Sequence, residues 1–328
     1  MLLRKRSKPI PLLKLEVLIP RMPLYFKQLP IMQADLASRV TGYIGERKVD
    51  YQLRSLTRKY TILHDVYLEL PYGNSVQIDS LILTPNAIFI IESKNYKGTI
   101  TFDTVLKQLI RDDGEKETGF KYPITQAENH RIHLENWLHD HHFSNIPIYY
   151  FIAIAEPSTI VKVEGDKQAI AKAVVHAEYL PQRILEMDSA CSRHNRGGLP
   201  VQKIANAILR ECGEFDVDIM GQYGVTPEIV LPGVRCPECG HLGMERTHSN
   251  WYCPKCKTCS PHAHRQALAT YLLLIRPWIT NSECMRFLKI QSRNVATRLM
   301  KDTGLINDRQ HRRWVIGTEY KLEDILKK

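Results

Sequence analysis

The sequence predicts an α/β protein in which helices flank a mixed sheet and two small C-terminal modules follow. Three observations support this fold class. Up to about residue 215, segments with apolar residues at helical spacing alternate with strand-like apolar runs. Five of the eight cysteines lie between Cys236 and Cys259, and the C-terminal segments again have helical spacing. The 328 residues are enough for two or three domains.

Residues 1–34 are predicted to form a basic N-terminal arm. Five prolines interrupt this segment, and only residues 12–18 have the apolar spacing of a short helix. From residue 31 to 59, apolar side chains recur three to five positions apart, which is typical of a longer helix. We therefore expect the arm to pack against a larger domain that begins near residue 35.

That larger domain is predicted to be α/β and to cover residues 35–215. Apolar runs of strand character predict its strands, at 61–70, 76–83, 87–94, 146–155 and 171–176. A turn is expected at 84–86, where the sequence is Thr-Pro-Asn. Helical spacing predicts the later helices, at 123–139, 180–187 and 201–212. A linker rich in Gly, Pro and Asp then follows at 216–233.

Charge is distributed unevenly along the chain. The net charge is +6 over residues 1–40, −2 over 41–150, −3 over 151–230 and +9 over 231–328. Basic ends around a slightly acidic middle suit a protein that holds a polyanion next to a carboxylate centre. A soluble protein with basic tails has the same distribution, so charge alone leaves both interpretations open.

The apolar runs and the cysteines bear on the cellular compartment. No uncharged apolar run of 18 residues occurs, so we expect no transmembrane helix. Pro11, Lys14 and Glu16 interrupt the segment that would have to be apolar in a secretory leader, so we expect a cytoplasmic protein. In that compartment eight cysteines do not indicate a disulfide framework.

Three charged residues lie where the core of a sheet rarely tolerates charge. Glu92 and Lys94 share one face of their strand because side chains repeat every two residues, and the turn at 84–86 brings Asp79 level with Glu92. Two carboxylates and a lysine suit metal-assisted phosphodiester hydrolysis, in which Mg²⁺ activates a water and the lysine orients it or helps to deprotonate it, and stabilises the transition state. The alternative is a partly buried Glu92–Lys94 ion pair, with Asp79 capping a loop. Glu46, on the preceding helix, adds a third candidate carboxylate.

The sequence around these charges resembles a known family. The segments that carry the resemblance are Gly45-Glu46, Gly73-Asn-Ser-Val-Gln-Ile-Asp79, Ile91-Glu-Ser-Lys94-Asn-Tyr-Lys-Gly98 and Tyr122-Pro-Ile-Thr-Gln126. Together, over about residues 38–150, they resemble the NERD (nuclease-related) domain, a branch of the PD-(D/E)xK nuclease-like superfamily. Tyr122 stands where that family usually has Asn, and Ser93 where it commonly has Thr or Val.

The resemblance implies a restriction-endonuclease-like core, a mixed sheet with helices. It implies that Asp79 and Glu92 bind Mg²⁺ or Mn²⁺, with the backbone carbonyl of Ser93 completing the ligand set. Lys94 would be the catalytic lysine. The resemblance also implies that Glu46 is an auxiliary acid and that Gln126 lines the site. Folds of this kind also serve as binding modules, but the residues that the chemistry requires are present here.

The cysteine cluster after the linker predicts a zinc ribbon. Cys236 and Cys239 form one C-x-x-C pair and Cys253 and Cys256 another, with thirteen residues between the pairs. Four thiolates at this spacing suit a closed tetrahedral Zn²⁺ site, which is structural because it leaves no open position. Cys259 is an alternative ligand in place of Cys256. Unligated cysteines and a redox pair are the competing interpretations.

The C-terminal segment is predicted to be a helix-turn-helix. Residues 281–288 and 292–303 have helical spacing on either side of a short break. The second helix would present polar and basic side chains to a DNA major groove, and the basic segment after it would contact phosphates. The candidate nucleic-acid-binding residues are Ser292, Arg293, Asn294, Arg298, Lys301, Arg312 and Arg313. A helical bundle that contacts protein is the alternative.

These features predict a Mg²⁺-dependent nuclease or a nuclease-like DNA-processing protein. The predicted partner is nucleic acid, with DNA favoured, and no membrane is involved. A non-catalytic DNA-binding protein that uses the nuclease-like core as scaffold or sensor is the principal alternative, and a protein-interaction adaptor with basic ends is a third. The predicted segments are the arm 1–34, the nuclease-like domain 35–215, the linker 216–233, the zinc ribbon 234–260 and the helix-turn-helix module 261–328.

Overall fold

The chain folds into two compact units, which a computed structural model describes over residues 1–193 and 198–317. The first unit comprises Met1–Pro9 and Ser38–Asp216, and the second comprises Ile10–Ala37 and the residues from Val217 onward. Helix α2, Leu29–Leu53, begins in the second unit and ends in the first. Neither unit is therefore a continuous segment of the sequence.

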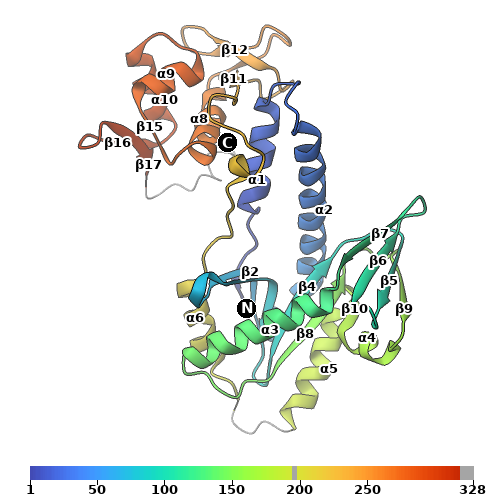
Figure 1. Cartoon of the computed structure of the whole chain (residues 1–328). Helices are drawn as coiled ribbons and strands as arrows, with labels where there is room; N and C mark the ends of the chain where they lie inside the picture. The colour runs from blue at the N-terminus through green and yellow to red at the C-terminus, as the bar shows by residue number, and fades with distance from the viewer. Residues whose placement is uncertain (194–197, 318–328) are drawn as a thin grey trace. The chain divides into compact units, whose positions relative to one another are not determined.

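A six-stranded mixed sheet forms the centre of the first unit (Figure 1). In spatial order its strands are β1 (Leu2–Arg4), β2 (Thr61–Glu69), β3 (Ser75–Leu83), β4 (Ile88–Lys94), β8 (Ile148–Ile154) and β10 (Val174–His176). β3 is antiparallel to both β2 and β4. β1 runs parallel to β2, and β8 runs parallel to β4 and β10. The strands predicted at 61–70, 76–83, 87–94 and 146–155 are thus present.

Helices cover both faces of this sheet, so the first unit has three layers. These helices are α2, α3 (Pro123–Asp140), α5 (Leu180–Ser192) and α6 (Val201–Glu211). Successive residues of β4 enter different cores: Ile91 packs with α2 and α5, whereas Ile90 packs with α3 and α6. The alternation follows from the period of two along a strand. A mixed α/β fold is confirmed.

A second sheet in the first unit was not predicted from the sequence. Its strands, in spatial order, are β7 (Glu117–Lys121), β6 (Gln108–Asp112), β5 (Thr99–Asp103) and β9 (Ile160–Glu164). Only the inward residues are strongly apolar, such as Ile100, Phe102 and Leu109, and they share a core with α3 and β8. Charged residues at the other positions weaken the apolar run by which a strand is identified in a sequence.

The strand predicted at 171–176 is wrong for its first half. Helix α4, Lys167–Ala173, occupies that half, and only Val174–His176 forms strand β10. Asp166 begins the helix, because its Oδ1 accepts the backbone N–H of Gln168 and of Ala169, each at 3.0 Å. An acidic N-cap before an alanine-rich segment favours helix.

One hydrophobic core, drawn from distant parts of the sequence, holds the second unit together. Leu15, Leu18 and Met22 pack in the same core as Trp251 and Leu268. Residues 10–34 of the predicted arm are therefore integral to this unit. Its elements are α1 (Ile10–Leu18), η1 (Ile19–Arg21), the first part of α2, α7 (Ile219–Gln222), β11 (Val234–Arg235), β12 (Leu242–Arg246), β13 (Trp251–Tyr252), β14 (Cys259–Ser260), α8 (Ala263–Leu274), β15 (Trp278–Ile279), α9 (Asn281–Leu288), α10 (Arg293–Asp302), β16 (Leu305–Asp308) and β17 (Arg313–Ile316).

A buried arginine fixes the N-terminal segment in this core. Arg21 is only 3% exposed, and its Nη1 donates to the carbonyl oxygens of Leu231 and Gly233, each at 3.0 Å. Its guanidinium also lies over the ring of Phe287, 4.8 Å from the centroid. Burial, with a smaller effect of the Arg235 charge, lowers the pKa of Arg21 to about 10, so the side chain is still charged at neutral pH.

Two further observations concern the chain as a whole. None of the helices in residues 1–193 and 198–317 combines the length and the apolar character of a membrane span. The five predicted segments stay predictions, and the two units divide the predicted arm, with residues 1–9 in the first unit and 10–34 in the second. Residues 318–328 of the predicted C-terminal module lie outside the described residues.

Helix α2 closely approaches the end of β4 at Gly45. A Cβ atom at this position would lie 2.4 Å from the Cβ of Asn95, the residue after β4. At Gly42, three residues earlier on the same helix, an added Cβ would meet no atom within 4 Å. The absence of a side chain at position 45 therefore lets α2 lie against the strand end that carries Glu92 and Lys94.

We predict that Gly45→Ala destabilises the first unit by about 1–3 kcal/mol, because the methyl group must displace α2 or Asn95. Gly42→Ala is the matched control and should be neutral or stabilising by up to about 1 kcal/mol, since alanine is the better helix former. Urea unfolding of both variants measures the difference. Equal changes in unfolding free energy would contradict the close approach.

Candidate active site and metal centre

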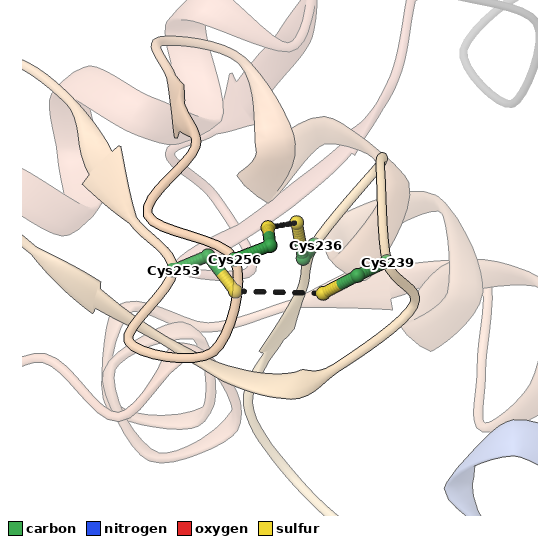
Figure 2. Close-up of side chains that lie close together, drawn as sticks. All are labelled: Cys236, Cys239, Cys253 and Cys256. Atoms are coloured by element: carbon green, nitrogen blue, oxygen red, sulfur yellow. Dashed lines mark hydrogen bonds between the residues drawn. The ribbon is translucent and has the colours of Figure 1, made fainter.

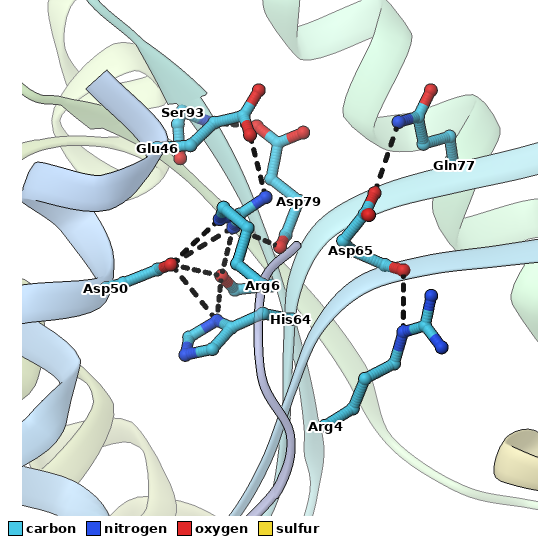
Figure 3. Close-up of polar contacts among 10 residues, drawn as sticks. Arg4, Arg6, Glu46, Asp50, His64, Asp65, Gln77, Asp79 and Ser93 are labelled. Carbon is cyan, nitrogen blue, oxygen red and sulfur yellow. Dashed lines mark hydrogen bonds and ion pairs between the residues drawn. The ribbon is translucent and has the colours of Figure 1, made fainter. Parts of the chain in front are cut away.

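The candidate active site lies where strands β3 and β4 separate. Their pairing runs from Leu83 opposite Ile88 to Ser80 opposite Ile91. Beyond that point Oδ2 of Asp79 accepts the backbone N–H of Ser93, at 2.7 Å (Figure 3). Asp79 therefore meets the backbone of β4 directly after Glu92, which is the arrangement expected from the turn at 84–86.

Glu92 and Lys94 form an ion pair on the side of β4 that faces α3. Lys94 Nζ donates to Glu92 Oε1 at 2.8 Å and to Oε1 of Gln126 on α3 at 3.1 Å. Glu92 is 4% exposed, and the Lys94 side chain is 18% exposed. The structure thus brings together Asp79, Glu92, Ser93, Lys94 and Gln126.

Burial has the largest effect on the charges of this pair. It raises the pKa of Glu92 above its usual value; the charge of Asp79 adds to the rise, and Lys94 opposes it. Burial by itself would lower the pKa of Lys94, but the attraction and hydrogen bond of Glu92 outweigh it and raise that pKa. Lys94 is therefore protonated at neutral pH, and a further positive charge near Glu92 would favour its ionised form.

Two buried polar atoms beside this pair make no hydrogen bond within the described residues. They are Oε2 of Glu92 and Nδ1 of His130, which lie 3.6 Å apart. An unpaired carboxylate oxygen in a buried place is unfavourable unless a cation or a donor meets it. Carboxylate and carbonyl oxygens are the ligands that Mg²⁺ and Mn²⁺ prefer. The donors of Asp79, Glu92 and Ser93 therefore fit such a cation.

Arg6 extends from the N-terminal segment into the same centre (Figure 3). Its Nη1 donates to Glu46 at 2.7 Å, and its Nε and Nη2 donate to the two oxygens of Asp50 at 2.8 and 3.0 Å. Nη2 also donates to the carbonyl oxygen of Asp79 at 2.6 Å and to the Ser80 hydroxyl at 3.3 Å. The Arg6 side chain is 4% exposed. Burial alone would lower its pKa, but the hydrogen bonds and charges of these acids raise it above the usual value.

Glu46 lies beside the predicted ligand pair, on helix α2. Burial raises its pKa to about 7, the charge of Asp79 adds to the rise, and Arg6 opposes it. Within the described part of the chain, Glu46, Asp79 and Glu92 do not bring three carboxylate oxygens within 4.8 Å of one another. The position suits an auxiliary acid that contacts the metal indirectly, and that role stays a prediction.

His64 remains neutral in this network although a carboxylate is its neighbour. Its Nδ1 lies 2.8 Å from the Ser80 hydroxyl and 3.0 Å from Oδ1 of Asp50. By distance the second contact is an ion pair. However, burial lowers the pKa of His64 to about 4, and Asp50 offsets only part of this effect. At neutral pH the imidazole of His64 is therefore uncharged, and its contact with Asp50 is not an ion pair.

Sequence reasoning missed Arg6 and Asp50, and it assigned no role to His130, which belongs to the segment after Gln126 that also carries the family resemblance. Asp50 follows Glu46 by four residues and His130 follows Gln126 by four, so helical spacing already placed each pair on one helix face. Arg6 lies in a basic run that is typical of a solvent-exposed tail. Its contact with Asp79 joins residues 73 positions apart, which no local pattern indicates.

Four cysteines of the second unit converge on one point (Figure 2). Cys236 Sγ lies 3.6 Å from Cys256 Sγ, and Cys239 Sγ lies 3.6 Å from Cys253 Sγ. All four sulfur atoms lie within 4.8 Å of one another. Four thiolates around a tetrahedral Zn²⁺ would be about 3.8 Å apart, given Zn–S bonds of about 2.3 Å. The geometry fits a structural Zn²⁺ site.

Each C-x-x-C pair is closed by a residue in the left-handed conformation. Gly240 has φ +72° and Lys257 has φ +66°, and their N–H groups donate to the carbonyl oxygens of Cys236 and Cys253 at 3.1 and 2.9 Å. Lysine thus fills the position for which glycine is more usual. Cys259 lies on β14, outside the four-sulfur cluster, so its assignment as alternative ligand is not supported.

The zinc-binding segment is linked to helix α10 through a buried histidine. Trp251 is 1% exposed, and its Nε1 donates to Nδ1 of His264 at 3.2 Å. Nε2 of His264 lies 3.2 Å from Oδ2 of Asp302, the last residue of α10. Burial lowers the pKa of His264 to about 4, so the ring is neutral at pH 7. Trp251 therefore belongs to the core and is not available to stack on bases.

Most of the predicted nucleic-acid-binding residues on α10 face solvent. Arg293, Asn294, Arg298 and Lys301 are exposed. Ser292 caps the helix, because its hydroxyl accepts the N–H of Val295 at 3.4 Å. Residues 289–292 form the short turn between α9 and α10.

The other predicted residues lie on the hairpin of β16 and β17. Arg312 is exposed at the turn of this hairpin. Arg313 donates from Nε to Asp308 at 3.1 Å, and its guanidinium lies 5.6 Å from the ring centroid of Trp278. The charge of Arg313 is therefore partly compensated within the protein.

Comparison with known proteins agrees with the geometry of the first unit. Residues 41–155 match the family model described as the nuclease-related domain, NERD. The match covers about a third of the chain and includes the residues brought together at the candidate active site. Residues 41–155 of the first unit are therefore similar to the nuclease-related domain.

Relatives add little beyond this match. An uncharacterized protein of Bacillus anthracis is 30% identical over 128 residues. The alignment covers 39% of this chain and 56% of that relative, so the chain spans only about half the length of the curated relative that it matches. No solved structure matches the chain.

We predict that Cys239→Ser loses the bound zinc and destabilises the second unit, whereas Cys259→Ser keeps one zinc per chain. Removing one thiolate opens the four-sulfur site, but Cys259 lies outside it. Elemental analysis and thermal unfolding of the two purified variants measure both effects. Full zinc content in Cys239→Ser would refute the assignment.

Proposed function

We propose that the first unit hydrolyses phosphodiester bonds of nucleic acid in a Mg²⁺-dependent reaction. One observation carries the proposal: within a segment that matches the nuclease-related domain, Glu92 contacts Lys94, lies close to Asp79 and has a buried carboxylate oxygen that makes no hydrogen bond among the described residues. A nuclease requires these groups together, whereas a structural ion pair does not require an unpaired carboxylate oxygen.

Asp79, Glu92 and the carbonyl of Ser93 are the proposed metal ligands. Bound there, Mg²⁺ would lower the pKa of a coordinated water and offset charge on the phosphate. The Ser93 N–H orients the Asp79 carboxylate. Lys94 orients Glu92 through its 2.8 Å contact with Oε1, which leaves Oε2 without a hydrogen bond among the described residues.

Lys94 acts in this proposal as a hydrogen-bond donor and not as a base. Its raised pKa keeps the ammonium group protonated at neutral pH. Two of its three N–H bonds are directed at Glu92 and Gln126, and the third is available for a phosphate oxygen or the attacking water. A fixed positive charge at this point stabilises the negative charge of the transition state.

Arg6 is a positioning residue for the same chemistry. Its hydrogen bond to the Asp79 carbonyl oxygen fixes the backbone of β3 at the ligand, and its contacts with Glu46 and Asp50 tie α2 to that point. A charged guanidinium also offsets part of the repulsion between the carboxylates and opposes the rise in the pKa of Glu46. The auxiliary role of Glu46 depends on this contact.

We further propose that the second unit binds DNA. Helices α9 and α10 with their short turn have the arrangement of a helix-turn-helix, and the β16–β17 hairpin follows as a basic wing. Arg293 and Arg298, exposed on α10, are placed to contact bases or phosphates. The proposed zinc-binding segment is linked to the C-terminal end of α10 through the contact between His264 and Asp302.

A non-catalytic DNA-binding function remains the second candidate, and one observation favours it. Arg6 already compensates Glu46 and Asp50, so part of the acidic cluster is neutral without any metal. A nuclease-like core used only as scaffold or sensor would need that compensation. Dependence of turnover on Mg²⁺ separates the two candidates.

We predict that Asp79→Asn and Lys94→Met each lower the cleavage rate by about 100-fold or more, since they remove a ligand charge and a transition-state donor. Cleavage of mixed single- and double-stranded DNA and RNA should require Mg²⁺, stop with chelator and return on adding Mg²⁺. Asp140→Asn, at an exposed position of α3, is the control. Unchanged rates in both variants would refute the site. No cleavage by the wild type, with salt-sensitive DNA binding intact, would favour the non-catalytic candidate.

For the second unit, Arg293→Ala combined with Arg298→Ala should weaken DNA binding and reduce its salt dependence. Each lost phosphate contact lowers the slope of log K against log salt concentration by about 0.9 for duplex DNA. Lys27→Ala with Lys255→Ala removes the same charge from exposed positions elsewhere in this unit and should leave the slope nearly unchanged. Identical slopes in the two variants would exclude α10 as the binding element.

A further inference from the structure

A pocket of about 750 Å³ in the first unit borders the acidic centre and is not used by the proposed chemistry. Arg6, Asp50 and His64 form one end of it. The remaining walls come from α2, from the 3₁₀ turn η2 (Arg54–Leu56), and from the chain after β8 and β10. The pocket therefore leads from solvent to the residues that hold Glu46 and the backbone of Asp79.

The charged side chains around this pocket leave an excess of positive charge. Asp50 is paired with Arg6, and Lys48 is paired with Glu156 at 2.8 Å. Lys5, Arg47 and Arg54 also line the pocket and have no carboxylate within ion-pair distance among the described residues. Glu178 is the remaining acid of the lining. Three uncompensated cations against one carboxylate favour an anionic ligand.

Aromatic side chains alternate with these cations along α2. Tyr43, Arg47, Tyr51 and Arg54 follow one another at intervals of four, four and three residues, which places them on one face of the helix and its extension. Arg47 lies 5.9 Å from the ring centroid of Tyr43, and Arg54 lies 5.5 Å from that of Tyr51. Tyr51 is 64% exposed although it is a large aromatic residue. Much of the Tyr51 side chain is therefore accessible to a base.

The far wall of the pocket carries a polar atom without a partner. His176, the last residue of β10, lines the pocket, and its Nδ1 is buried and makes no hydrogen bond within the described residues. Buried polar atoms are normally paired. A ligand that fills the pocket would meet this nitrogen with a hydrogen-bonding group, as the edge of a nucleobase does.

We propose that this pocket and the adjoining face of α2 bind an unpaired nucleic-acid strand, which makes single-stranded nucleic acid, or a single-stranded end, the substrate class of the first unit. The inference rests on the proposed nuclease function. Single strands are bound by cationic grooves with aromatic side chains on which bases stack. A duplex keeps its bases stacked on each other, and a pocket of this volume is of the size that holds small ligands rather than a double helix.

The test compares strand binding by two variants of the full chain. Tyr51→Ala/Arg54→Ala removes an aromatic and a basic residue of the pocket, whereas Tyr25→Ala/Arg58→Ala removes the same residue types from exposed positions outside it. Both variants and the parent carry Arg293→Ala and Arg298→Ala, so that the DNA-binding site proposed for the second unit contributes little.

The ligands are fluorescent oligothymidine, oligouridine of the same length and a matched blunt duplex, and anisotropy is measured without Mg²⁺. The pocket variant is expected to bind the single strands about 10-fold to 100-fold more weakly than the parent, with a smaller loss on the duplex. The control variant should bind like the parent. Comparison of the affinities for oligothymidine and oligouridine tells whether the pocket binds single-stranded DNA, single-stranded RNA or both.

Equal single-strand affinity in the pocket and control variants overturns the inference, and so does an equal loss on single strand and duplex. Binding without Mg²⁺ does not depend on turnover, so this result is separate from the Asp79→Asn cleavage assay. If cleavage does not depend on Asp79 while strand binding depends on Tyr51 and Arg54, the proposed chemistry fails and the strand-binding pocket stands.

Discussion

The guanidinium of Arg6 is the interaction on which the acidic centre of the first unit depends. Glu46, Asp50 and the Asp79 carbonyl oxygen surround it in a place where only 4% of its side chain is exposed. Carboxylates this close together and this deeply buried would otherwise repel one another or take up protons. With the positively charged Arg6 in place, α2 can lie close to the point where β3 and β4 separate. The absence of a side chain at Gly45 leaves the space for this approach. The position of Glu46 and the inner end of the basic pocket both follow from this contact.

Much of the candidate active site could be predicted because its geometry is local. Asp79, Glu92 and Lys94 lie on two strands joined by a tight turn, and the period of two along a strand determines which side chains face the same way. Gln126 was implied by family resemblance and does contact Lys94. Arg6 was not predicted, because its partners are 40 to 74 positions away and no periodic pattern connects them. The small sheet from β5 to β7 and β9 was missed because charged residues interrupt its apolar positions.

In the second unit, the spacing of four cysteines was sufficient to predict a cluster that could bind zinc, since thiolate pairs at this spacing have few other uses. The spacing did not decide between Cys256 and Cys259; the structure does, because the sulfur of Cys256 and not that of Cys259 lies within 4.8 Å of the other three. The helices α9 and α10 were predicted from apolar spacing. The burial of Leu15, Leu18 and Arg21 in this unit was not predictable, because it depends on residues some two hundred positions later in the chain.

The interleaving of the two units has a consequence for biosynthesis. During translation, the apolar face of α1 leaves the ribosome long before its partners in residues 219–314 have been made. Throughout that interval Leu15 and Leu18 lack the later residues of their core, and the cores of the first unit do not include them. Exposed apolar surface on an incomplete chain promotes aggregation and is the kind of surface that chaperones bind. The nascent protein is thus most vulnerable to aggregation while its first unit is already complete and its second unit is not.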